Sequence, residues 1–244
     1  MCTVTFIPVK DKFYITSNRD EKHLRRQAIP PGIYFENGNR ILYPKDADAG
    51  GTWIAMNENA NAAVLLNGGF EKHISQPPYR KSRGVIFLEI ITAVMPVRYF
   101  MHMDLLEIEP FTMIIFDKFL YECRWTGITK HCKQLRKHRP YIWSSSTLYD
   151  EAVVKKREQW FAAFLNRNPH PTQDEIMAFH QFTGDGDIQN DLRMNRSGLL
   201  STVSVTGIAL EYRHCKMKYL DLKDNSIHDK EMNLIAALSE VDIF

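Results

Sequence analysis

Long apolar runs are scarce in this sequence. The longest, GVIFLEIITAVMPV, is interrupted by Glu89 and Pro96 and falls short of the roughly 20 residues that span a bilayer. An apolar leader is missing as well, because Lys10, Asp11 and Lys12 stand where the apolar part of a signal peptide would lie. We therefore expect a cytoplasmic protein without integral membrane association.

An excess of charge of one sign is also missing. The 244 residues include 31 Lys and Arg against 29 Asp and Glu, and no long basic run occurs. Binding to nucleic acid usually needs a concentrated basic surface. The composition therefore predicts no nucleic-acid partner.

Cysteine is sparse, and the spacings that bind metals are absent. No C-x-x-C pair, H-E-x-x-H, P-loop, G-x-G-x-x-G or G-x-S-x-G occurs. The segment GDGDIQND begins like a calcium loop at Asp185 and Asp187, but it has Asn190 where a glycine is required and Arg196 where a glutamate is required. We expect a turn there, and neither a metal nor a cofactor in this protein.

What the sequence does contain is a series of strand and helix patterns. β-branched and alternating runs separated by turn residues predict hairpins at 2–8 with 12–17, 52–57 with 62–67, 111–117 with 118–125, and 199–213 with 216–223. Apolar periodicity predicts helices at 82–95, 150–167, 172–182 and 229–238.

Two of the predicted helices carry further signals. Pro96 is expected to end or kink the first, and Thr172 with Glu175 forms a capping box at the start of the third. In the helix at 150–167, an apolar side and an outward-facing polar side are expected. The apolar side comprises Val153, Val154, Trp160, Phe161, Phe164 and Leu165, and the polar side Lys155, Lys156, Arg157 and Glu158.

The predicted strands and helices are grouped along the chain and do not alternate strictly. This order favours an α+β fold with antiparallel sheets covered by helices. Neither an internal repeat nor a linker-like segment is visible, so we expect one domain over residues 1–244.

The position of Cys2 offers a specific chemistry. Removal of Met1 would give this residue both a thiol and a free α-amine, whose reference pKa is about 7.7–8.0. Nucleophile and base would then belong to one residue. Such a site also needs a cation beside the thiolate, an acid to hold the amine, and donors for an oxyanion.

Three other residues could meet those needs. A hairpin of 2–8 with 12–17 would return Arg19 and Asp20 beside Cys2, and Asn67 ends a predicted strand just before two glycines. On the residues alone, the alternative is an incidental cysteine and an ordinary polar turn.

At these residues the sequence resembles a known family. The MC start, NRDE at 18–21, GGTW at 50–53 and LLN at 65–67 resemble the NRDE family, also called the transport and Golgi organisation protein 2 family. That family is similar to the cysteine N-terminal-nucleophile hydrolases, which include bile-salt hydrolases and penicillin V acylase. The resemblance implies a four-layer αββα sandwich of two antiparallel sheets between helices.

The resemblance also implies roles for individual residues. Cys2 matches the nucleophile, Arg19 and Asp20 match the Arg and Asp that accompany it, and Asn67 matches the oxyanion Asn of the first sheet. Arg196 is the nearest match to a late family arginine. Ser146 stands where the family has a second Asn, so one oxyanion donor is missing from the pattern.

Three functions are compatible with this sequence. The first is a cysteine amidohydrolase or acyltransferase acting on a small non-peptide C–N amide. The second is a non-catalytic binder of a haem-like, lipid or acyl-CoA ligand in the same cleft, and Met101, His102 and Met103 form one local cluster of possible axial ligands. The third is a structural protein in which Arg19 and Asp20 only tie two strands together. The expected partner is thus a small-molecule substrate or an apolar ligand.

Overall fold

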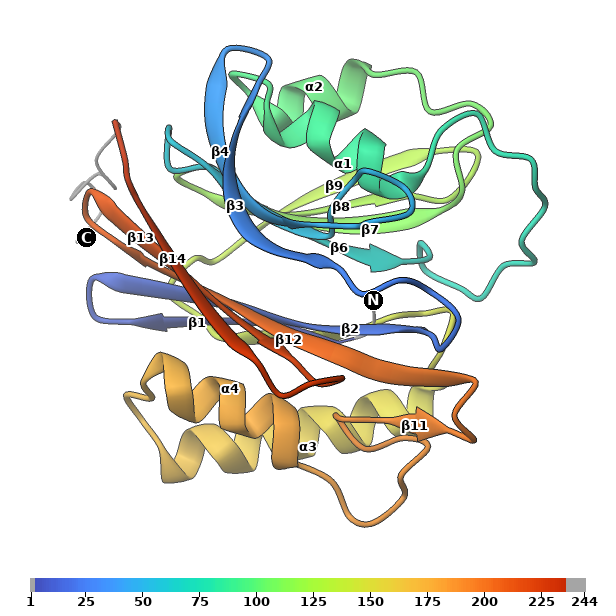
Figure 1. Ribbon diagram of the computed structural model, residues 1–244, viewed down its shortest axis with the longest axis vertical. Coiled ribbons are helices and arrows are strands. Elements are labelled where there is room, and N and C mark those ends of the chain that lie inside the picture. The colour runs from blue at the N-terminus through green and yellow to red at the C-terminus, as the bar shows by residue number, and fades with distance from the viewer. Residues whose placement is uncertain (1–2, 236–244) are drawn as a thin grey trace.

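Two antiparallel sheets make up the centre of the molecule (Figure 1). The computed structural model describes residues 3–235. The first sheet has the spatial order β10-β1-β2-β12-β13-β14, with β11 beside β12. Its strands are β1 (Thr3–Val9), β2 (Lys12–Lys22), β10 (Tyr141–Ser144), β11 (Asn195–Arg196), β12 (Leu200–Glu211), β13 (His214–Asp221) and β14 (Ile227–Asn233).

The second sheet follows the order of the chain. Each of its strands pairs with the next one, as expected when short loops join antiparallel neighbours. The strands are β3 (Ile29–Glu36), β4 (Asn39–Lys45), β5 (Ile54–Asn57), β6 (Ala62–Asn67), β7 (Phe111–Phe116), β8 (Leu120–Trp125) and β9 (Lys130–Leu135).

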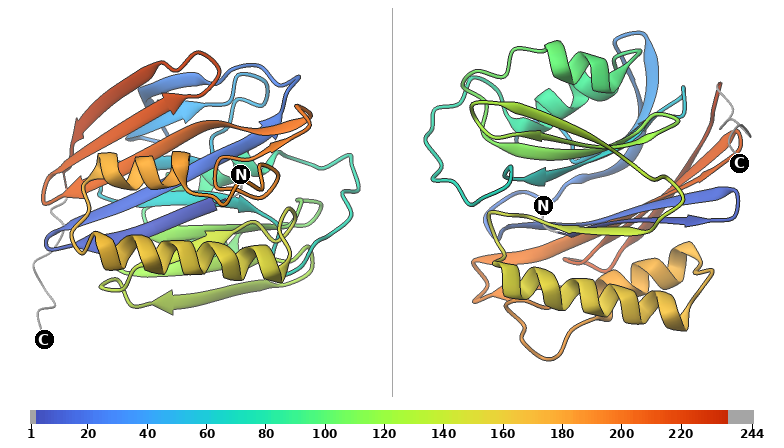
Figure 2. Two further views of the ribbon diagram at one scale, coloured as in Figure 1. Left: turned by 90° about the horizontal axis from the view of Figure 1, so that it is seen from below. Right: turned by 180° about the vertical axis from the view of Figure 1, so that it is seen from behind.

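Helices cover the outer face of each sheet (Figure 2). The helices α1 (Arg83–Ile91) and α2 (Pro96–His102) lie on the second sheet, and α3 (Glu151–Arg167) and α4 (Gln173–Phe182) lie on the first. The predicted α+β class and the αββα sandwich are therefore confirmed. The single domain over 1–244 stays a prediction.

The side-chain alternation of β1 explains why the sheets stack. Phe6 is buried between the sheets, where its ring lies 5.9 Å from that of Phe116 on β7. The next residue, Ile7, belongs instead to the cluster beneath α3 and α4, with Phe161 and Phe179. Successive residues of a strand point to opposite faces, so β1 supplies both the central core and the helix-facing core.

The predicted hairpins form, and their register positions the start of the chain. In β1 and β2, Thr3 pairs with Asn18 and Val9 with Lys12. The hairpins β5–β6, β7–β8 and β12–β13 are also present. The predicted capping box of α4 is confirmed, since the Thr172 and Glu175 side chains each accept from the other's backbone N–H.

The predicted helix at 229–238 is wrong over the part that the structure describes. Residues 227–233 form β14, which pairs with β13 and buries Met232 opposite Cys215. Residues 236–238 lie outside the described residues. Charged side chains on an exposed edge strand, here Asp229, Lys230 and Glu231, are a common protection against aggregation, and they obscured the strand pattern.

The proline expectation also needs correction. The helix α1 ends at Ile91, where Thr92 caps it, so Pro96 neither ends nor kinks it. Pro96 begins α2. Proline suits the first position of a helix because its missing N–H would have no partner there.

Candidate active site

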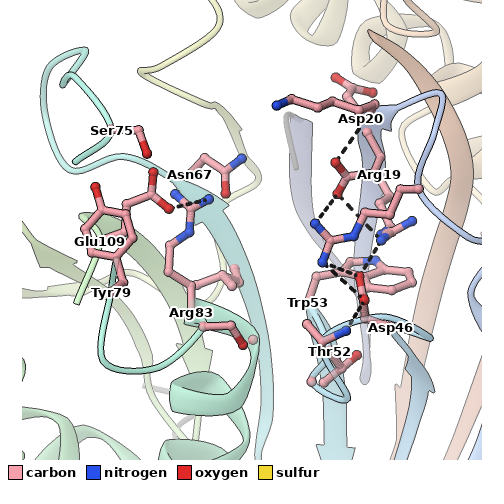
Figure 3. Close-up of a pocket in the computed structure, with 18 of the residues that line it drawn as sticks. Arg19, Asp20, Asp46, Thr52, Trp53, Asn67, Ser75, Tyr79, Arg83 and Glu109 are labelled. Atoms are coloured by element: carbon pink, nitrogen blue, oxygen red, sulfur yellow. Dashed lines mark hydrogen bonds and ion pairs between the residues drawn. The ribbon is translucent and has the colours of Figure 1, made fainter. Parts of the chain in front are cut away.

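A cavity of about 700 Å³ lies where β2 of the first sheet faces the second sheet (Figure 3). Arg19 and Asp20 on β2 and Asn67 at the end of β6 all line it. Arg196 is not among the described residues that line the cavity, and Cys2 lies outside the described residues. The structure therefore brings three of the five candidate residues together.

Strand geometry explains why the side chains of Asn18, Arg19 and Asp20 have different surroundings. Consecutive side chains of β2 point to opposite faces. The Asn18 side-chain amide donates to the carbonyls of His180 and Leu192 on the helix side of the sheet. Arg19 points toward the second sheet, and Asp20 again meets partners near the helix layer. These three consecutive residues thus place side chains on both faces of the first sheet.

Arg19 is held by a carboxylate and an indole from the side of the second sheet and by a carboxylate of its own strand. Its Nη2 lies 2.5 Å from Oδ2 of Asp46 and 3.6 Å from Oε2 of Glu21. Its guanidinium lies over the ring of Trp53, 4.6 Å from the ring centroid. A planar cation between a carboxylate and an indole is fixed in orientation as well as in charge.

Asp46 is the anion at the centre of this cluster. Burial tends to raise the pKa of Asp46, but hydrogen bonds from the Ala49 N–H and Arg25, with the nearby charge of Arg19, outweigh burial and lower that pKa. The carboxylate therefore stays ionised and keeps Arg19 in place. Asp46 could not be identified from the sequence, because only the fold brings residue 46 to residue 19.

Asp20 accepts two hydrogen bonds. The Thr202 hydroxyl donates to Oδ1 at 2.6 Å, and the Tyr149 hydroxyl donates to Oδ2 at 3.0 Å. Asp20 is 4 % exposed. Its carboxylate is therefore oriented from two sides at the edge of the cavity. Neither Thr202 nor Tyr149 was identified from the sequence.

The side-chain amide of Asn67 has no hydrogen-bond partner among residues 3–235. The backbone carbonyl of Asn67 accepts a hydrogen bond from the Ser145 hydroxyl at 2.8 Å. Ser146, at the position of the missing family Asn, does not line the cavity; its hydroxyl lies 3.4 Å from the carbonyls of Gly69 and Glu71. In the described part of the chain, Ser146 therefore does not replace the second donor.

The opposite wall of the cavity is built by the start of α1 (Figure 3). Nη2 of Arg83 lies 3.1 Å from Oε2 of Glu109. Tyr79 and Ser75 line the cavity beside this ion pair. Burial lowers the pKa of Arg83, and the charge of Glu109 opposes this effect. Paired charges thus lie on both walls.

Arg157 was expected to face solvent, and that expectation is wrong. Its side chain is fully buried, and it donates to the Thr3 hydroxyl at 2.5 Å and to the carbonyls of Asn190 and Asp191 at 2.9 Å. Its guanidinium also lies 3.6 Å from the centroid of the Tyr149 ring. A buried cation satisfied in this way anchors β1 at its first described residue.

Arg196 lies behind the cavity wall. Its Nη2 donates to the Leu148 carbonyl at 2.8 Å, and its guanidinium lies 5.4 Å from the centroid of the Tyr149 ring. Leu148 lines the cavity. Arg196 can therefore act on the cavity through residues 148 and 149.

Removing the Asp46 carboxylate should be costly. Asp46→Ala is expected to destabilise the protein by about 3 kcal/mol, because it leaves the buried Arg19 without its nearest anion. Asp48→Ala is the matched control: it breaks a pair with the exposed Arg26, which should cost less than about 1 kcal/mol. Urea unfolding of both variants gives the comparison, and equal losses would contradict the role of Asp46.

A second buried network joins β1, β2 and α4. The fully buried ring of His180 lies with Nε2 2.8 Å from the Thr5 hydroxyl and with Nδ1 in contact with the Asn18 side-chain oxygen. Because the Asn18 amide donates to two carbonyls, its oxygen is the acceptor and Nδ1 carries the proton. Burial, with the charge of Arg157, lowers the pKa of His180 to about 3.

This pKa predicts how stability depends on pH. His180 is neutral when folded, so the unfolded chain binds its proton first as the pH falls below 6.5, and stability is lost. The difference in unfolding free energy between wild type and His180→Gln should shrink by about 2 kcal/mol between pH 6.5 and 5. Asp117, whose pKa burial raises to about 6, acts in the opposite direction but is present in both proteins. A pH-independent difference would contradict the assignment.

Known proteins with solved structures share this fold, and they identify the fold class. Penicillin V acylase from Agrobacterium tumefaciens matches with a TM-score of 0.58 and 10% identity, over 95% of this chain and 86% of that one. The N-acylethanolamine-hydrolyzing acid amidase ortholog from Caenorhabditis elegans matches with 0.58 and 11% identity, over 85% and 92% of the two chains. A cysteine-to-alanine mutant of conjugated bile acid hydrolase from Clostridium perfringens matches with 0.55 and 12% identity, over 99% and 100%.

The fold is therefore that of the N-terminal-nucleophile hydrolases. Residues 1–212 match the model of the family described as Transport and Golgi organisation 2, and the chain belongs to that family. No curated protein matches this sequence.

Two expectations outside the cavity can also be compared with the structure. No helix within residues 3–235 is long and apolar enough to cross a membrane. Met101 and Met103 line one surface hollow, whereas His102 lines another and its Nδ1 bonds the Arg98 carbonyl, so these two hollows do not bring the three possible axial ligands together.

Proposed function

We propose that this protein is a cysteine N-terminal-nucleophile amidohydrolase or acyltransferase that acts on a small non-peptide C–N amide. The observation that carries the proposal is the placement of Arg19, Asp20 and Asn67 around one cavity. Thr3, the residue after Cys2, pairs with Asn18 at the same end of β2. The first described residue of the chain therefore lies beside the strand that carries Arg19 and Asp20.

In this mechanism, Cys2 becomes the first residue once Met1 is removed. Its α-amine takes the thiol proton, and the sulfur attacks the amide carbonyl carbon. The amine then passes the proton to the leaving nitrogen, and a thioester remains on Cys2. Water completes hydrolysis, or an acceptor amine completes acyl transfer.

The surrounding residues have separate roles. Arg19 favours the thiolate, and Asp46 and Trp53 hold its guanidinium in place. Asp20 orients the α-amine. Asn67 supports the oxyanion with the side-chain amide that no other group in residues 3–235 occupies. Arg196 is a positioning residue that supports Tyr149, the hydrogen-bond donor to Asp20.

The lining of the cavity favours a polar substrate over the alternative of an apolar ligand. Arg19, Asp46, Arg83 and Glu109 are four of the charged residues around it. A haem-like or lipid ligand buried against these groups would displace the water that solvates the charges, and its apolar surface would offer no hydrogen bonds in return. The names of two structural neighbours concern acyl chemistry and not polarity, since penicillin V acylase and N-acylethanolamine-hydrolyzing acid amidase are named for acting on acyl compounds.

The test is a panel of small N-acyl amides, with penicillin V, an N-acylethanolamine and a bile-acid conjugate as starting compounds. Protein lacking Met1, confirmed by intact mass, is incubated with each, and release of the free amine is measured. Turnover of at least one amide of the panel and a thioester on Cys2 are expected. Tight binding of apolar ligands without any turnover or thioester would instead support the alternative of a non-catalytic ligand-binding protein.

A further inference from the structure

Two cysteines outside the cavity face each other across neighbouring strands. Cys123 on β8 and Cys132 on β9 are direct partners in the antiparallel register. Their sulfur atoms lie 3.3 Å apart. Direct antiparallel partners have Cα atoms about 4.5–5.5 Å apart, which falls within the roughly 4.4–6.8 Å range of disulfides. The backbone therefore needs no rearrangement to join them.

The two thiols differ in access and in acidity. Cys132 is exposed, whereas Cys123 is buried. The hydrogen bond to Cys132, together with burial, raises the pKa of Cys123 far above its ordinary value. The same hydrogen bond lowers the pKa of Cys132, although burial and the charge of Asp117 oppose this effect. Cys123 therefore holds its proton more firmly, and Cys132 is the exposed sulfur that becomes a thiolate more readily.

We infer that Cys123 and Cys132 form a reversible oxidation site, in which a peroxide reacts with Cys132 and Cys123 then closes a cross-strand disulfide. The site is separate from the proposed function and does not depend on it. Its position matters because β9 ends the second sheet and pairs with β8 alone among the described strands. The disulfide would join this edge strand covalently to its neighbour.

The chemistry balances in two steps. The Cys132 sulfur attacks one peroxide oxygen, the O–O bond breaks, and a sulfenic acid forms while water or an alcohol leaves. The Cys123 sulfur then attacks the Cys132 sulfur, the S–O bond breaks, and the hydroxyl leaves as water with the Cys123 proton. Two thiols and one peroxide thus give one disulfide, with the peroxide as oxidant. A thiol reductant reverses the reaction by exchange.

The test uses the full chain, hydrogen peroxide in slight excess, and peptide mass spectrometry after free thiols are blocked. Trypsin cleaves after Arg124 and Lys130, so the two cysteines fall on separate peptides, 119–124 and 131–133. A linked pair that separates on reduction is the expected product, and Cys215, which is buried, should stay free. Cys132 oxidised further while Cys123 remains a free thiol would overturn the inference, as would a disulfide between two molecules.

Variants assign the order of the two steps. In Cys123→Ser, dimedone should trap a sulfenic acid at Cys132 about tenfold faster than at Cys215, since the exposed sulfur reacts first. In Cys132→Ser, no dimedone adduct should form at Cys123. Trapping at Cys123 would contradict the assigned order. If Cys123→Ser does not fold, the linked peptides of the wild-type chain still decide whether the site exists.

Discussion

Cys2→Ala is expected to lower turnover of any amide substrate by about 10⁴-fold or more, with the fold unchanged. The reason is that the substitution removes the thiol nucleophile and leaves only the α-amine base of the proposed mechanism. Loss of either function in other nucleophilic enzymes removes most of the rate enhancement. Amine release by the two purified proteins, compared at equal concentration, measures the effect.

The control for that experiment is Cys132→Ser, which removes an exposed thiol on β9, away from the cavity lining. Its turnover should match that of the wild type. Cys2→Ala with more than about a tenth of wild-type activity would mean that another group attacks the amide, and the N-terminal nucleophile mechanism would be wrong.

Asn67→Ala should lower turnover by about 100- to 1,000-fold, the usual loss when one oxyanion donor is removed. Its side-chain amide lines the cavity and has no partner within residues 3–235, so the substitution breaks no protein hydrogen bond that would confuse the result. The backbone carbonyl that accepts from Ser145 is retained in the variant.

A second reaction separates this role from a general effect on the site. Alkylation of Cys2 by iodoacetamide builds no oxyanion, so Asn67→Ala should change its rate by less than about twofold. A parallel loss of turnover and alkylation would indicate that Asn67 positions the nucleophile and does not support an oxyanion.

Much of the fold was predictable because its central strands carry local signals. The β1–β2, β5–β6, β7–β8 and β12–β13 hairpins have alternating or β-branched runs separated by turn residues. The strands that were missed lie toward sheet edges or contain proline. For example, β3 includes Pro30 and Pro31, which edge strands tolerate, and β9 reads as polar. Their pairing comes from the sheet and not from their own pattern.

Only those residues of the site that lie on recognisable strands could be predicted from the sequence. Arg19, Asp20 and Asn67 could be found because each stands near the end of a recognisable strand. Asp46 and Tyr149 could not, since each reaches the site through tertiary contacts with residues 27 and 129 positions away. The buried Arg157 occupies a helix position that amphipathic spacing assigns to solvent, and its burial depends on Thr3 and on the carbonyls of residues 190 and 191.

In the proposed mechanism Cys2, as the N-terminal residue, attacks an amide beside Arg19, Asp20 and Asn67. The most direct test of this mechanism is intact-mass detection of an acyl thioester on two preparations, one lacking Met1 and one retaining it. With Met1 retained, the α-amine is locked in a peptide bond and cannot serve as the base. An acyl adduct on Cys2 is expected only in the preparation without Met1. Equal acylation of both preparations, or of neither with every amide in the panel, would contradict it.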